Sequence, residues 1–275
     1  MLFIKAEIYN MNMKIFKIYL SQGENNSMDK MDCQQFHPTN NKGKEVWDYY
    51  DLSELSILQS FAYAKPKYAE HYKDCKNFML DSGGFTLIHS KSAKTFDIKK
   101  FTKEYGEFVK KYGVENFVEL DVDNVYDMET YIYCLHLLQD ITGKDPLRVF
   151  HLWRGKEYWE ELTKQKDYVC LAALEENKLQ KPQSFRWFLD TAHKNGCKVH
   201  GLGETRTDQL LQYDFDTVDS STWTHGSRAG CMYHFNGSGI KVFESNDNGK
   251  RCDNEWLNKW NFKEWSDYSK MMLEI

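Results

Sequence analysis

The sequence predicts an α/β fold: a single-domain (β/α)8 barrel (TIM barrel) with a C-terminal helical extension. The first observation is that short apolar runs alternate with helical patterns of ten or more residues, as in a parallel sheet built from crossover units. The second is that about eight such runs fit within 275 residues, which favours a closed barrel over an open doubly wound sheet. No G-x-G-x-x-G or phosphate-binding loop follows any run, which weighs against a dinucleotide or nucleoside triphosphate site.

The expected strands are short apolar runs that end in glycine or polar residues. They lie at 15–20, 78–80, 117–120, 147–150, 168–171, 198–201 and 217–218. Residues 52–64 mix helical and strand patterns, so the sequence leaves their structure open. Residues 24–46 are polar and without periodicity, and we expect a loop there.

The clearest helix is expected at 96–112, where apolar side chains repeat at intervals of three and four before Gly113. A second helix has Tyr131, Ile132, Leu135 and Leu138 on one face. Further helices are expected around 158–162, 185–192 and 207–211, and the Trp-rich C-terminus indicates a helix or a helix pair. We expect one catalytic domain over 1–275, with a dispensable extension at 1–13 and C-terminal helices at 253–275.

Composition restricts the class of partner and the compartment. A net charge of -5 gives no general attraction for nucleic acid, so a polyanion site needs a local basic patch. The seven cysteines are scattered without a CxxC pair, which favours a reducing cytoplasm and disfavours structural zinc. The apolar N-terminus is interrupted by charged residues, so it is expected to be neither a signal peptide nor a membrane span.

Polar residues follow several expected strands, and these ends converge on one face of a barrel. They are Asp81, Asp121, His151, Gly203 and Asp219. Three carboxylates at one mouth repel one another, so at least one should titrate abnormally or meet a ligand. A helix-capping role would explain any one aspartate alone, but it does not explain the glycine pair 83–84 beside Asp81.

Two segments carry a resemblance to a known family. The sequence DSGGF at 81–85, with HGLG at 200–203 and VDSSTWTHGSRAG at 218–230, resembles the tRNA-guanine transglycosylase superfamily. Within it, the chain is most similar to the phage and bacterial DNA transglycosylases that exchange guanine for a 7-deazaguanine. The resemblance covers roughly residues 78–230.

The resemblance implies a pentosyltransferase whose catalytic residues are Asp219, the nucleophile, and Asp81, the acid and base for the departing and incoming bases. It also implies a set of substrate-binding residues. Ser82, Gly83 and Phe85 correspond to the wall of the base pocket, and Asp121 to the carboxylate that reads the guanine edge. His151 stands near the position where the tRNA enzymes read the base with a Gln, and Ala173 replaces one of their glycines. Gly203 and the phosphate-contacting Arg228 complete the set. Further candidates for phosphate contact are Lys91, Lys94, Arg154 and Arg206, although each alone is more often a solvated surface charge. Trp223 is a candidate for base stacking, and a packed role for it is equally open.

The resemblance also implies the partners: DNA, with tRNA less favoured, and a free 7-deazaguanine base, without a cofactor, metal or membrane. The cysteine-rich zinc motif of the tRNA enzymes is absent from the sequence, which favours DNA. A tRNA exchanger and a catalytically silent nucleic-acid-binding barrel stay open. A third alternative is a metal-assisted hydrolase that uses Asp81, Asp219, His151, His200 and His225. The expected location is the cytoplasm of a bacterium or of a phage host.

Overall fold

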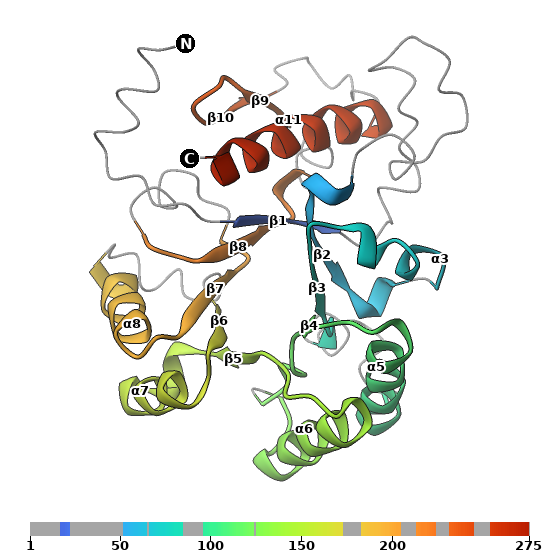
Figure 1. The fold of residues 1–275 in the computed structure, drawn as a ribbon, viewed down its shortest axis with the longest axis vertical. Helices are drawn as coiled ribbons and strands as arrows, with labels where there is room; N and C mark the ends of the chain where they lie inside the picture. The colour runs from blue at the N-terminus through green and yellow to red at the C-terminus, as the bar shows by residue number, and fades with distance from the viewer. Residues whose placement is uncertain are drawn as a thin grey trace.

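The computed structural model describes residues 17–22, 52–64, 66–84, 96–123, 125–172, 183–204, 213–223, 231–244 and 254–274. Figure 1 shows a ring of strands around a centre, with helices on the outside. The expected loop at 24–46, the extension at 1–13 and the helix around 207–211 lie outside the described residues.

Eight parallel strands form the ring. They are β1 (Lys17–Gln22), β2 (Ser56–Ser60), β3 (Asn77–Asp81), β4 (Asn116–Phe117), β5 (Arg148–Phe150), β6 (Tyr168–Ala172), β7 (Lys198–Leu202) and β8 (Thr217–Ser220). Hydrogen bonding gives the order β4-β3-β2-β1-β8-β7-β6-β5. A parallel bridge between Val118 and Leu147 joins the two ends of this order. The ring is therefore closed, and the predicted (β/α)8 barrel is confirmed.

The join between β4 and β5 is a short seam with few backbone bonds. Leu147 accepts from the Glu119 N–H at 2.9 Å and donates its own N–H to Phe117 at 2.8 Å. The buried Glu119 side chain reinforces the seam, because its Oε1 accepts the Val149 N–H at 2.8 Å and its Oε2 lies 3.2 Å from Arg148. Burial raises the pKa of Glu119, and the Arg148 charge opposes that rise.

Helices cover the ring, and their ends match the capping residues in the sequence. The longer ones are α5 (Ile98–Tyr112), α6 (Met128–Thr142), α7 (Lys156–Gln165), α8 (Gln183–Lys194) and α11 (Asn254–Glu274). Asp97 accepts the Lys100 N–H at the start of α5, and Gly113 ends it with φ 65°. The expected face of α6 is wrong at Ile132, which is 42% exposed, because Tyr131, Cys134 and Leu138 face the core instead.

The undecided segment 52–64 contains β2, flanked by the short 3-10 helices η2 (Leu52–Glu54) and η3 (Phe61–Tyr63). These helical turns directly beside a strand explain the mixed pattern. Shorter turns, α3 (Pro66–Ala69) and η4 (Tyr72–Asp74), lead into β3, and η6 (Leu152–Arg154) follows β5.

One small apolar cluster joins buried side chains of the barrel strands. Its members are Leu58, Met79, Val118, Val149, Cys170 and Ala172, from neighbouring strands. Since side chains alternate along a strand, Asp81 lies two residues beyond Met79 on the same inner side. His151 likewise lies two residues beyond Val149, in an extended conformation. The barrel thus directs both side chains into its carboxyl-terminal mouth.

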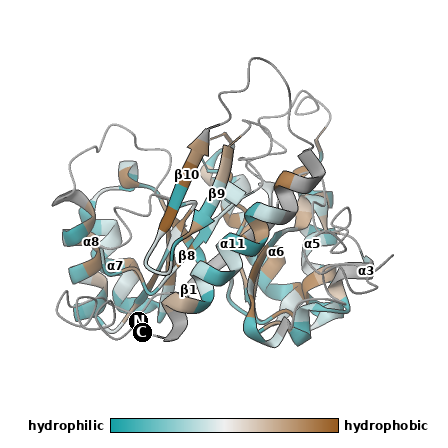
Figure 2. Ribbon diagram, turned by 90° about the horizontal axis from the view of Figure 1, so that it is seen from above, coloured by the Kyte–Doolittle hydropathy of each residue, from teal (hydrophilic) through white to brown (hydrophobic). Residues whose placement is uncertain are grey.

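A β-hairpin of β9 (Cys231–Phe235) and β10 (Ile240–Glu244) was not expected from the sequence. Figures 1 and 2 show it beside α11, the single C-terminal helix. The buried Asn261 of α11 accepts the Tyr233 N–H at 2.9 Å and donates to Cys231 O at 3.1 Å, which fixes the hairpin on the helix. Among the described helices, none is long and apolar enough to cross a membrane.

Candidate active site at the barrel mouth

The turn after β3 positions Asp81 at the mouth. The Gly83 N–H donates to Asp81 Oδ2 at 2.9 Å, and the Gly84 N–H donates to Ser82 Oγ at 3.3 Å. Gly83 has φ 71°, and a Cβ there would lie 2.2 Å from Ser60 Oγ. Glycine is therefore required at 83 for this turn, in which the backbone itself holds the carboxylate.

Asp81 is a carboxyl group that keeps its proton near neutral pH. Its pKa is raised to about 7, first by burial and then by the negative charges of Asp219 and Asp121, while the Gly83 N–H opposes the rise. The expectation from the sequence rests on repulsion among the three carboxylates, whereas burial is the larger cause of this shift. The same interactions show that the structure brings these three side chains together.

Asp219 lies in β8 and is 7% exposed. Its Oδ1 accepts the Gly203 N–H at 2.5 Å and lies 3.3 Å from His200 Nε2. The His200 ring is set by a 2.6 Å contact between its Nδ1 and Thr217 Oγ1, and Tyr168 also hydrogen-bonds Thr217. The HGLG segment thus supplies two neighbours of Asp219, the Gly203 N–H and the His200 ring.

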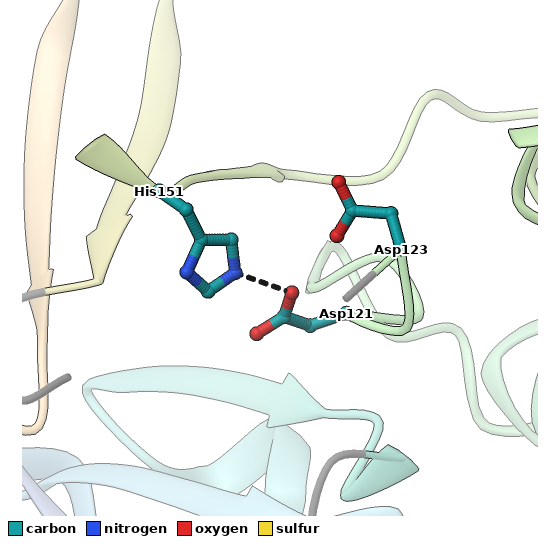
Figure 3. A group of neighbouring side chains, drawn as sticks. All are labelled: Asp121, Asp123 and His151. Carbon is teal, nitrogen blue, oxygen red and sulfur yellow. Dashed lines mark hydrogen bonds and ion pairs between the residues drawn. The ribbon is translucent and has the colours of Figure 1, made fainter. Parts of the chain in front are cut away.

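Asp121 and His151 form a pair across the seam between β4 and β5. His151 Nε2 lies 2.6 Å from Asp121 Oδ1, and the side chains are 2% and 18% exposed. Figure 3 shows this contact with Asp123 beside it. One ligand atom from each of Asp121, Asp123 and His151 lies within 4.8 Å of the others, so these residues are a group that could hold a metal ion.

The Arg154 side chain is buried in this wall, beside a partner that no sequence pattern indicates. Its Nε donates to Asp123 Oδ2 at 2.9 Å, and its side chain is 7% exposed. It is therefore fixed in an ion pair, which contradicts its candidate role as a free phosphate contact. Trp223 is fully buried against Phe262, with ring centroids 5.0 Å apart, so the packed alternative holds there.

The buried thiol of Cys170 lies below the three acids. Burial raises its pKa, and so do the charges of Asp81, Asp219, Glu119 and Asp121. A thiol with a raised pKa is a poor nucleophile, so Cys170 is a packing residue of the barrel interior.

Several predicted site residues lie outside the described residues. These are Phe85, Ala173 and Arg228, together with His225 of the hydrolase alternative and the phosphate candidates Lys91, Lys94 and Arg206. The described part of the site therefore consists of Asp81 and Asp219, the turn at 82–84, Gly203, and the Asp121–His151 pair.

No protein-family model and no curated protein matches the chain. Among solved structures, two mutant forms of the tryptophan synthase alpha-subunit from the hyperthermophile Pyrococcus furiosus are similar to it. The first has 13% identity and a TM-score of 0.46, and the alignment covers 92% of this chain and 98% of that one. The second has 12% identity and a TM-score of 0.45, with the same coverage. By its own strand order and closure, the chain is a (β/α)8 barrel with its acidic residues gathered at the carboxyl-terminal mouth.

Proposed function

We propose that the protein is a base-exchange glycosyltransferase that replaces guanine in DNA with a 7-deazaguanine through a covalent ester on Asp219. The observation that supports this most is the contrast between two carboxyl groups at one mouth. Asp81 has a pKa raised to about 7, whereas Asp219 accepts a backbone N–H at 2.5 Å. A buried carboxyl group with a raised pKa beside a second carboxyl group suits glycosidic bond cleavage, which needs an acid and a nucleophile.

In the first step, an Asp219 oxygen attacks C1′ of the sugar as the bond from C1′ to the base nitrogen breaks. The bonding electron pair goes to the departing guanine, and the proton of Asp81 goes to the guanine ring. The positive charge that develops on the sugar is stabilised by the Asp219 carboxylate. In the second step, Asp81 takes a proton from the incoming base, whose nitrogen displaces Asp219 from C1′.

Recognition of the base is assigned to Asp121, with His151 as its positioning partner. A carboxylate accepts from both the N1–H and the exocyclic amine, which guanine and its 7-deaza analogues share. The 2.6 Å contact with His151 fixes the orientation of Asp121 without occupying both of its oxygens. The target nucleotide must leave a duplex to reach this pocket, at a cost of a few kcal/mol.

The experiment is incorporation of labelled guanine into DNA and, in parallel, into tRNA by the purified protein. We expect labelled DNA with the parent and none with Asp219→Asn or Asp81→Asn. Asp140→Asn is the matched control, because Asp140 is exposed on α6. A covalent adduct between protein and polymer, stable in denaturant, should form with the parent and be absent with Asp219→Asn.

The outcomes separate the alternatives. Labelling of tRNA alone would overturn the choice of DNA and leave the mechanism intact. If neither polymer is labelled and no adduct forms, the base-exchange proposal is wrong.

A further inference from the structure

We propose that Asp121, Asp123 and His151 form a binding site for a divalent transition-metal ion at the barrel mouth. Their ligand atoms, two carboxylate oxygens and one imidazole nitrogen, lie within 4.8 Å of one another. Ligands about 2.1 Å from an ion lie at most about 4.2 Å apart. The farthest pair, if it is 4.8 Å apart, must therefore close by at least about half an ångström before one ion can reach all three atoms.

The side chain of Asp123 gives the strongest indication of a missing partner. It is 0% exposed, and its Oδ1 has no hydrogen-bond partner among the described residues. Its other oxygen accepts from Arg154 at 2.9 Å. A buried carboxylate oxygen without a partner is costly, and coordination to a cation would satisfy it. Figure 3 shows the Asp123 carboxylate on the side of the Asp121–His151 pair.

Arg154 hydrogen-bonds a proposed ligand of the ion without itself being a ligand. Its guanidinium donates to Asp123 Oδ2 and leaves Oδ1 for the ion. Ligating carboxylates at metal sites are commonly oriented by a hydrogen bond of this kind. Three aromatic rings hold the guanidinium in place, with centroids 5.4 Å away at Tyr131, 5.5 Å at Trp153 and 5.1 Å at Tyr158. Asp123 is therefore pre-oriented before any ion arrives.

The charge balance at the mouth also favours a cation. Asp121 and Asp123 bring two carboxylates together beside His151, with one oxygen of each within 4.8 Å of the other. The Arg154 guanidinium is already paired with Asp123. An ion between Asp121 and Asp123 would reduce the repulsion among the acids.

The donor set selects the class of ion. Mixed carboxylate and imidazole ligands suit Mn²⁺, Fe²⁺ or Zn²⁺, whereas Ca²⁺ and Mg²⁺ prefer oxygen ligands alone. Three protein ligands leave coordination positions open to water or to a bound molecule.

The test is direct ion binding to the full chain, stripped with chelator and then dialysed. We expect MnCl2 titration, followed by loss of the free Mn²⁺ paramagnetic resonance signal, to give one bound ion per chain. Asp123→Asn and His151→Gln should each weaken binding at least about tenfold. His193→Gln is the matched control, because His193 forms another His–Asp pair, 3.0 Å from Asp216 and partly exposed. It should leave the affinity unchanged.

Three outcomes would overturn the proposal: no ion bound by the parent, unchanged affinity in both site variants, or the largest loss in His193→Gln. If Asp123→Asn fails to fold, His151→Gln alone decides. Since the readout is ion binding, the result does not depend on whether the protein exchanges bases. Should it do so, saturating Mn²⁺ is expected to slow exchange, because the ion occupies the carboxylate assigned to the base.

Discussion

Replacement of Asp81 by asparagine should change how the stability of the protein depends on pH. Asparagine has the shape of the protonated acid, keeps an oxygen to accept the Gly83 N–H, and cannot ionise. In the parent, the folded-state pKa is about 7, against a model value of 3.8 for the free side chain. Between these two values the folded state binds more protons than the unfolded state, so the free energy of unfolding falls as pH rises.

The magnitude follows from 1.36 kcal/mol per pKa unit. Across the whole window, from about pH 4 to about pH 7, the contribution of Asp81 falls by at most about 4 kcal/mol, and solvent at the mouth reduces this by screening the charge. Between pH 5 and pH 8 the parent should lose up to about 3 kcal/mol that Asp81→Asn retains. Above about pH 8 the two profiles should run parallel, since Asp81 is then largely ionised in both states of the parent.

Urea unfolding of both proteins at half-unit steps from pH 5 to pH 8 measures this difference. Asp140→Asn should follow the parent, because its carboxylate is exposed on α6. If the difference between the parent and Asp81→Asn does not vary with pH, Asp81 has no raised pKa, and its assignment as the proton donor fails with it.

Three further predictions concern the turn after β3, the pH profile of exchange and an exposed aromatic ring. Gly83→Ala should destabilise the protein by more than the roughly 1–2 kcal/mol of a left-handed alanine, because its Cβ would also lie 2.2 Å from Ser60 Oγ. Gly113→Ala, with φ 65° and no atom near its Cβ, isolates the backbone part, and equal losses by urea unfolding would contradict the steric argument. The kcat/KM of guanine release should fall about tenfold per pH unit above pH 7 as Asp81 loses its proton; a flat profile would remove Asp81 from the acid role. Trp153 is 56% exposed beside the His151 ring, and its replacement by alanine should weaken single-stranded DNA binding about fivefold or more by fluorescence anisotropy. Unchanged binding would mean that the indole does not contact the strand.

Much of the fold could be predicted from the sequence, because parallel strands in a barrel are short apolar runs with clear stops. The strand at 56–60 was not predicted, since the helical turns on both sides of it hide its period. The hairpin after residue 230 was also missed, although Asn236-Gly237 at its tip is a known hairpin signal between alternating residues.

The candidate site could also be predicted only in part from the sequence. Strand ends predict which aspartates converge, because topology alone brings them together. The ion pair of Arg154 with Asp123, and the Glu119 contacts at the seam, join residues about thirty positions apart. No local pattern encodes such pairs, since they depend on the register between β4 and β5.

The seam between these two strands makes the geometry of the mouth sensitive to local opening of the barrel. Asp121 follows β4 and His151 follows β5, so their 2.6 Å contact spans the place where the ring has its fewest backbone bonds. A transient separation of β4 from β5 would part the Asp121 carboxylate from His151 before other strands are disturbed. The rate of amide hydrogen exchange at Leu147 and Glu119 would therefore report how often the hydrogen bonds between β4 and β5 open, with no ligand present.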